Sequence, residues 1–265
     1  MIRADGLVVA YGAHRVLDGV DLAVRPGQVT GVVGPNGCGK TTLVRALLRA
    51  VRLAAGRVEV DGQDVARRSR RWLARRIAYV GQHAEPDPAL TVADEVGLGS
   101  LVRTGALVTG ARHDRTVVES LDLVGLTHLA TAHLAQLSGG ELQRVGIARA
   151  IAQRADHVLL DEPLNHLDVR HRLEVLALLP RIAPAVLVVL HDLDLAARYC
   201  DQVVLLDQGR VVGAGAPAQV LAPQVLARTY GVRVRRVIGP DDHPHFAFTL
   251  PDAPARPAPS PERTP

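Results

Sequence analysis

Apolar residues along the chain follow two spacings, one typical of buried strands and one typical of amphipathic helices. Continuous apolar runs predict buried strands at residues 29–33, 77–80 and 185–190. Apolar residues at helical spacing predict helices over residues 43–51, 116–123 and 142–152. Strands and helices that alternate in this way predict an α/β fold.

The pattern changes near the C-terminal end. After Ala216, two short helices are expected at residues 217–221 and 223–229, followed by strands at 232–238 and 246–250. Residues 251–265 are rich in proline and alanine. We therefore expect a disordered tail there.

The composition favours one large domain, or one domain with an insertion. The chain has 265 residues, of which 48% are hydrophobic, and can bury a substantial core. No apolar run approaches the ~20 residues that span a bilayer, and the N-terminus does not resemble a signal peptide. The chain is expected to be soluble on its own. Cys38 and Cys200 lie outside any C-x-x-C pair, which argues against a zinc ribbon or a disulfide framework and fits a reducing cytosol.

The formal net charge of +4 suits several anionic partners and decides nothing alone. The densest basic run, residues 67–76, contains Trp72 as its one aromatic residue. Single-strand binders usually interleave several stacking rings, so we interpret the run as a solvated amphipathic helix and expect no nucleic-acid partner. His243 and His245 flank a proline in an expected loop, where a metal role is disfavoured.

One lysine occurs in the chain, Lys40, and the other 30 of the 31 basic residues are arginine. It ends the run Gly34-Pro35-Asn36-Gly37-Cys38-Gly39-Lys40-Thr41-Thr42, which fits the phosphate-binding pattern G-x-x-x-x-G-K-[ST] between a predicted strand and a predicted helix. A compact ammonium reaches between phosphate oxygens where a guanidinium fork is too wide. The loop therefore predicts a nucleoside triphosphate site, in which the Thr41 hydroxyl coordinates Mg²⁺.

A second glycine motif, Leu137-Ser138-Gly139-Gly140-Glu141, precedes the predicted helix at 142–152. Glycines before a helix start form an anion-binding surface. This motif resembles the signature motif of ATP-binding cassette (ABC) ATPases. The other sequence motifs of that family are also present, in the family's order. Residues 158–162 resemble Walker B, residues 165–168 the D-loop, and His191 the switch histidine.

The resemblance implies a P-loop NTPase core of the ABC type, with an antiparallel β subdomain and an inserted helical subdomain. It places the nucleotide core at residues 1–82 and 156–215, the helical subdomain at about 90–155 and a C-terminal extension at 216–250. It assigns nucleotide contacts to Tyr11, Gly34, Pro35, Asn36, Gly37, Cys38, Gly39, Lys40, Thr41, Thr42, Gln82 and Asp161.

The resemblance also implies the catalytic roles. Glu162 would polarise the attacking water, His191 would contact the γ-phosphate and hold Glu162, and Lys40 would neutralise phosphate charge. Mg²⁺ would be held by Thr41, Gln82 and Asp161. Two departures from the family pattern are His157, at a usually apolar Walker B position, and Glu141, where glutamine is commoner.

By the same resemblance, Ser138, Gly139, Gly140 and Glu141 act on the ATP of a second copy, so a homodimer is expected, with Asp168 communicating across it. In the family, the groove beside the Q-loop receives a helix from a membrane permease, here at residues 82–96. Residues 165–171 and 188–201 resemble ATPases of bacterial importers for ferric siderophores, haem and cobalamin, which work with a substrate-binding protein. The alternative is a soluble ABC ATPase of a cytosolic assembly system such as Fe–S cluster biogenesis.

Cys38 lies two residues before Lys40. One interpretation is a small filler residue. The other is a reactive thiol, because a lysine and a helix N-terminus nearby are expected to lower the pKa of a cysteine.

Overall fold

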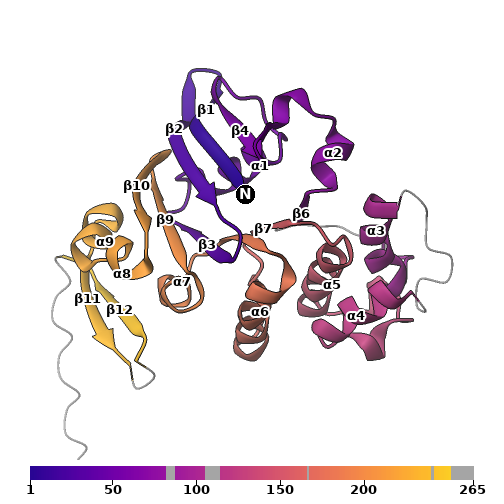
Figure 1. The fold of residues 1–265 in the computed structure, drawn as a ribbon. Coiled ribbons are helices and arrows are strands. Elements are labelled where there is room, and N and C mark those ends of the chain that lie inside the picture. Colours follow the sequence, from indigo (N-terminus) through magenta and orange to yellow (C-terminus); the bar gives the residue numbers. More distant parts are fainter. Residues whose placement is uncertain (82–86, 105–113, 166, 240–241, 252–265) are drawn as a thin grey trace, which may run out of the picture.

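The computed structural model describes residues 1–81, 87–104, 114–165, 167–239 and 242–251. Three sheets and their flanking helices make up the fold (Figure 1). Gln82, His166 and the tail from residue 252 lie outside the described residues, as does part of the expected permease groove.

A six-stranded sheet forms the centre, in the order β10-β9-β3-β8-β7-β6. Its strands are β3 (Gln28–Val33), β6 (Ile77–Val80), β7 (His157–Asp161), β8 (Ala185–Val189), β9 (Gln202–Asp207) and β10 (Arg210–Gly215). Neighbouring strands are parallel except for β10, which pairs antiparallel with β9. The apolar runs thus form the parallel strands that the sequence predicts, because strands buried on both faces need no polar alternation.

A four-stranded antiparallel sheet, in the order β2-β1-β4-β5, covers one face of the central sheet (Figure 1). Its strands are β1 (Ile2–Tyr11), β2 (His14–Val24), β4 (Ala55–Val60) and β5 (Gln63–Asp64). Leu7, Val20 and Val58 from this sheet pack in one core with Val32 and Val204 from the central sheet. The helix α1 (Lys40–Leu47) is buried in the same core.

Helices cover the opposite face of the central sheet, where Val29, Val188 and Val203 belong to a second core. The helices of this side are α3 (Val92–Thr104), α4 (Arg115–Leu123), α5 (Gly139–Ala152), α6 (Val169–Ile182) and α7 (Leu193–Tyr199), with short 3₁₀ turns at Thr127–Leu129 and Leu134–Gln136. A third 3₁₀ turn, Val65–Arg67, follows β5 and packs in the core of the four-stranded sheet. Figure 1 shows α3, α4 and α5 grouped at one end of the molecule. Within the described residues, no helix has the length and apolarity needed to cross a lipid bilayer.

Near the C-terminus, α8 (Pro217–Val220) and α9 (Pro223–Tyr230) precede a hairpin of β11 (Arg233–Ile238) and β12 (Pro244–Thr249), as the sequence predicts to within two residues. The hairpin is attached to α7 by Asp194, whose carboxylate accepts the Phe246 N–H at 2.9 Å and lies 3.0 Å from Nδ1 of His245.

The structure corrects the expectation about the basic run and shows what His157 does. The run 67–76 does not form one helix, because Ser69 caps a separate helix, α2 (Arg70–Ala74). The Arg76 guanidinium lies 4.1 Å from the centre of the Trp72 ring. The ring of His157 is buried and its Nε2 lies 3.0 Å from Asp61 Oδ1, which ties the first residue of β7 to the turn between β4 and β5.

Candidate functional site

In the glycine-rich loop between β3 and α1, two positions have no room for a side chain. Gly34 has φ of 150° and Gly39 has φ of 106°. A Cβ on Gly34 would lie 2.0 Å from the Leu206 carbonyl oxygen, and one on Gly39 would lie 2.9 Å from the Val16 carbonyl oxygen. The loop is therefore packed backbone against backbone between β2 and β9, which fixes its shape.

Lys40 is buried at the first position of α1, with 5% of its surface exposed. Its ammonium donates hydrogen bonds to the carbonyl oxygens of Gly34, at 2.8 Å, and Pro35, at 3.1 Å. The charge is thus held by the loop itself, above the N-terminus of a helix that attracts anions. A shallow hollow of about 190 Å³ opens here, lined by Val16, Asn36, Gly37, Gly39, Lys40, Thr41, Thr42, Glu162 and His191.

The next residue, Thr41, faces the end of β7. Its hydroxyl donates to Asp161 Oδ1 at 3.4 Å, and Asp161 is 1% exposed. The other carboxylate oxygen, Oδ2, is buried without a hydrogen-bond partner in the described part of the chain. Burial raises the pKa of Asp161, the Thr41 hydrogen bond opposes this, and the charge of Glu162 adds to the rise. An unpartnered carboxylate oxygen beside a hydroxyl is the oxygen donor set that Mg²⁺ prefers, so these residues fit the ion.

Glu162 follows Asp161 in a left-handed conformation, with φ of 55°. Its carboxylate lies between two polar side chains: Oε1 is 2.5 Å from His191 Nε2, and Oε2 accepts from Asn165 Nδ2 at 2.9 Å. Glu162 is mostly buried, with 11% of its side chain exposed, while 43% of the His191 side chain is exposed. The structure thus brings Glu162 and His191 together with Lys40, as the sequence predicts, and it adds Asn165, which sequence reasoning missed. Its signal was its place in the D-loop motif, three residues after Glu162.

Tyr11 lies at the end of β1, is 53% exposed and does not line the hollow. The side chain nearest to the Lys40 hollow from the four-stranded sheet is Val16 on β2. Gln82, the third expected Mg²⁺ ligand, is outside the described residues. These two assignments stay predictions.

Ser138 caps α5 and does not line the Lys40 hollow of its own chain. Its N–H and its hydroxyl donate to one oxygen of Glu141, at 2.8 and 2.7 Å, and the Glu141 N–H donates to the hydroxyl at 3.3 Å. The Ser138 hydroxyl lowers the pKa of Glu141, so this carboxylate stays charged. Asp168 caps α6 by accepting the His171 N–H at 2.8 Å, which lowers the pKa of Asp168.

Of the two interpretations of Cys38, the structure supports the filler residue, and the lowered pKa that the other interpretation required is wrong. The thiol is 4% exposed and its sulfur packs against Gly34. Burial raises the pKa of Cys38 and outweighs the opposing effect of the Lys40 charge. A buried, protonated thiol is a packing residue in the sense of the first interpretation.

Comparison with known proteins agrees with this arrangement. The ABC transporter family model matches residues 17–165, more than half of the chain. The cobalamin import ATP-binding protein BtuD of Halobacterium salinarum is 42% identical over 86% of this chain, although the chain spans only 58% of that protein's length. The hemin import ATP-binding protein HmuV of Pseudomonas entomophila is 40% identical over 88% of this chain and 94% of its own length. The ferric enterobactin transport ATP-binding protein FepC of Escherichia coli K12 is 34% identical over 88% of both chains.

Solved structures share the whole fold. An ABC transporter described as metal-chelate type, in an inward-facing conformation, matches with a TM-score of 0.79 and 26% identity over 94% of this chain and 98% of that chain. A dimeric bacterial ABC transporter cassette matches with a TM-score of 0.74 and 26% identity, over 82% of this chain and 99% of that chain. The chain therefore belongs to the ABC transporter family, as one of its ATP-binding proteins.

Proposed function

We propose that the chain is the ATP-hydrolysing subunit of a bacterial importer for a metal chelate, such as a ferric siderophore, haem or cobalamin. One observation carries the hydrolytic part. Glu162, held between His191 and Asn165, lines the same hollow as Lys40 and Thr41. The names of the relatives BtuD, HmuV and FepC support the substrate class.

ATP would place its phosphates in the glycine-rich loop. The Lys40 ammonium, now on the carbonyls of Gly34 and Pro35, would turn to the β- and γ-phosphate oxygens without leaving the loop. Thr41 and Asp161 would hold Mg²⁺, together with Gln82 as the sequence predicts. The ion, when bound, supplies positive charge against the negative charge that spreads over the transferred phosphoryl group.

Glu162 would act on water. Its Oε1 is engaged by His191 and its Oε2 by Asn165, and each oxygen keeps a second lone pair that can accept a water proton. The water oxygen then bonds to the γ-phosphorus, the bond to the β,γ-bridging oxygen breaks, and ADP and inorganic phosphate leave. The proton passes to Glu162 or directly to the phosphate formed. His191 would keep Glu162 aligned and contact the γ-phosphate from the exposed side.

A second copy of the chain would complete each site. Ser138 and the glycines after it lie at the N-terminus of α5 but not in their own chain's Lys40 hollow. Helix N-termini attract phosphates, so this surface would serve the ATP of the other copy. The match to a dimeric cassette supports this arrangement, with Asp168 at the interface.

A groove of about 560 Å³ is the proposed site for a helix of the permease. It lies between the α1–α2–β6 region and the helices α3 and α5, and it is lined by Leu48, Arg49, Ala50, Arg70, Leu73, Ala74, Ile77, Tyr79, Leu98, Gly99, Val102, Arg149, Ala150 and Gln153. The described residues 87–96 do not line this groove, because Val92 and Val96 turn into the core. The chain would then work at the cytoplasmic face of the membrane, with a substrate-binding protein acting only through the permease. We propose the same division of the chain as above, with residues 1–82 and 156–215 as the nucleotide core.

The hydrolytic proposal is tested by Glu162→Gln, which keeps the side-chain shape and removes the negative charge. ATP turnover should fall by about 10²–10⁴-fold, the range for loss of a general base, while ATP affinity is retained and a dimer accumulates. Glu174→Gln is the matched control, because Glu174 lies on α6 in an exposed pair with Arg170. Turnover of Glu162→Gln within tenfold of the control would refute the role of Glu162.

The transport proposal needs a separate experiment. A deletion strain should lose uptake of one iron or cobalt chelate and regain it with the wild-type chain but not with Glu162→Gln. Copurification with cytosolic scaffold proteins, with chelate uptake unchanged in the deletion strain, would instead favour the assembly-system alternative.

A further inference from the structure

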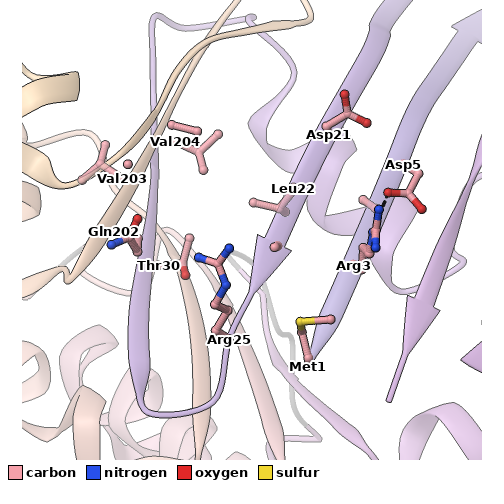
Figure 2. Close-up of a pocket in the computed structure, with 14 residues that line it drawn as sticks. Met1, Arg3, Asp5, Asp21, Leu22, Arg25, Thr30, Gln202, Val203 and Val204 are labelled. Carbon is pink, nitrogen blue, oxygen red and sulfur yellow. Dashed lines mark hydrogen bonds and ion pairs between the residues drawn. The ribbon is translucent and has the colours of Figure 1, made fainter. Parts of the chain in front are cut away.

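A second, larger hollow of about 650 Å³ lies between the four-stranded sheet and the central sheet (Figure 2). Residues of β1, β2, β3, β9 and β10 line it, and none of them lines the Lys40 hollow. Its size is within the range of small-molecule sites. The function proposed above makes no use of it.

The strand register fixes the floor of this hollow. Thr30 on β3 is aligned with Gln202 on β9, and Val204 on β9 is aligned with Ala214 on β10. Aligned residues on neighbouring strands share a face and lie about 5 Å apart. The floor is therefore polar at Thr30 and Gln202 and apolar at Val204 and Ala214. Leu22 and Ala4 add apolar surface from the opposite sheet.

The polar end has unused hydrogen-bonding capacity. Thr30 is 1% exposed, and its hydroxyl has no hydrogen-bond partner within the described ranges. A buried hydroxyl without a partner costs folding free energy, so it calls for an explanation. Arg25, just after β2, forms no ion pair with any described residue, and Figure 2 shows its guanidinium on the side of the hollow where Thr30 and Gln202 lie.

The other cations of the lining are already paired, and the Met1 ammonium lies 2.7 Å from Asp61. Arg3 pairs with Asp5 at 2.7 Å, and Arg57 adds a second contact to Asp5 at 3.1 Å. Asp21 accepts the Gly6 N–H at 2.7 Å. Arg25 is thus the cation of the lining that remains available to a ligand, together with a hydroxyl and an amide that can both donate.

We propose that this hollow binds a small organic carboxylate. The carboxylate would accept hydrogen bonds from Arg25, Thr30 and Gln202, because the planar guanidinium fork matches a carboxylate in geometry. The apolar body of the ligand would rest on Val204, Ala214 and Leu22. An inorganic anion would leave these apolar surfaces uncovered, so an organic acid is the better match.

The test uses the full-length protein and a panel of hexanoate, benzoate and succinate, titrated while amide NMR signals or thermal unfolding are followed. At least one of these acids should give a saturable change that ATP does not compete with. Hexan-1-ol, which lacks the carboxylate, and inorganic phosphate, which lacks the apolar body, should each bind at least about tenfold more weakly than the best acid.

Two variants probe the polar end. Arg25→Gln should weaken the best acid by about tenfold or more, whereas Arg52→Gln, an exposed arginine outside the hollow, should not change its affinity. Thr30→Val should weaken the acid too, yet raise the unfolding temperature of the ligand-free protein, because it removes an unpartnered buried hydroxyl.

Three results would overturn the proposal. The first is a protein that binds ATP but none of the three acids. The second is an acid that binds Arg25→Gln as tightly as wild type. The third is phosphate binding as tightly as the best acid, which would mean that the apolar floor contributes nothing.

Discussion

Replacing Asp161 by asparagine should stabilise the nucleotide-free protein. The side chain is 1% exposed, its Oδ2 is buried without a partner among the described residues, and its one hydrogen bond, from Thr41, is long at 3.4 Å. Asparagine has the same shape and no charge. The substitution should therefore remove the unfavourable free energy of a buried charge, which the wild type needs in order to bind a cation.

The size of the effect follows from the buried atom. Asparagine leaves a neutral amide at the same unpartnered position, so the gain is the added cost of burying a charge there, on the order of 1–3 kcal/mol. The unfolding temperature of a domain of this size class moves by about 2–4 °C per kcal/mol. Asp161→Asn should thus raise the unfolding temperature by roughly 2–12 °C, while Asp122→Asn, an exposed control on α4, should change stability by less than about 0.5 kcal/mol.

The pH dependence has a definite sign. Burial raises the pKa of Asp161 above its unfolded value, so the native state favours the protonated form. Its stabilising contribution is full below the unfolded pKa and is lost as pH rises through the folded pKa. The gap between the variant and the wild type should therefore be widest at neutral pH and should close as the pH approaches the usual aspartate value.

Calorimetric unfolding at neutral and acidic pH, with and without Mg²⁺ and ATP, measures all of this. Saturating Mg²⁺ and ATP should stabilise the wild type by ligand linkage and the variant much less. If the Asp161→Asn protein without ligand unfolds at or below the wild-type temperature, the Asp161 carboxylate does not destabilise the ligand-free protein and the reasoning is refuted. A gap that stays constant with pH would do the same.

Three further changes have definite expected outcomes. Lys40→Arg should abolish tight ATP binding although it keeps the charge, because the guanidinium is wider than the ammonium that Gly34 and Pro35 now enclose; near wild-type affinity in a nucleotide titration would contradict this. Cys38 should react with iodoacetamide more slowly than free cysteine at neutral pH, since burial raises the pKa of its thiol. Cys200, whose pKa is raised to about 12, should react more slowly still, and mass spectrometry of the labelled protein checks this order. Glu141→Gln should let the ATP-bound dimer of a Glu162→Gln background form at lower protein concentration, because it removes a charge beside a phosphate-binding surface; light scattering that shows an unchanged or weaker dimer would oppose this.

The sequence predicted the central strands closely but placed two helix starts too late. β6 has the predicted bounds, since four apolar residues in a row have little other explanation. The helix α1 begins at Lys40, three residues before its apolar pattern, because the left-handed Gly39 turns the chain and no side-chain cap marks the start. The helix α5 begins at Gly139, and its capping box of Ser138 and Glu141 is a sequence signal that the glycine motif obscured.

For the site, the motifs and the family resemblance indicated that His191 holds Glu162, but they did not indicate the contact between Asn165 and Glu162. The His191 contact depends on how β7 and β8 align, whereas the Asn165 contact is local, three residues along the chain. The lowered pKa that a reactive Cys38 would need was wrong for a reason of the same kind. Its sequence neighbours favour a thiolate, whereas its neighbours in space exclude water. The hollow proposed for a carboxylate depends on how β3 aligns with β9, which is distant from it in sequence, and on how β10 pairs with β9.

The helix α5 is packed tightly against α3 and contributes residues to two proposed binding surfaces. Gly99 on α3 sits so close to it that a Cβ would lie 2.1 Å from the Arg149 carbonyl oxygen, and Arg149 Nη1 binds the buried Glu95 at 2.6 Å. Arg149 also lines the groove proposed for a permease helix, and Ser138 caps the same helix eleven residues earlier, about 16 Å away along its axis. If the proposed dimer and permease sites are correct, a displacement at the groove would be carried along α5 to Ser138, so ATP binding at the dimer interface and contact with the permease would be coupled through this one helix.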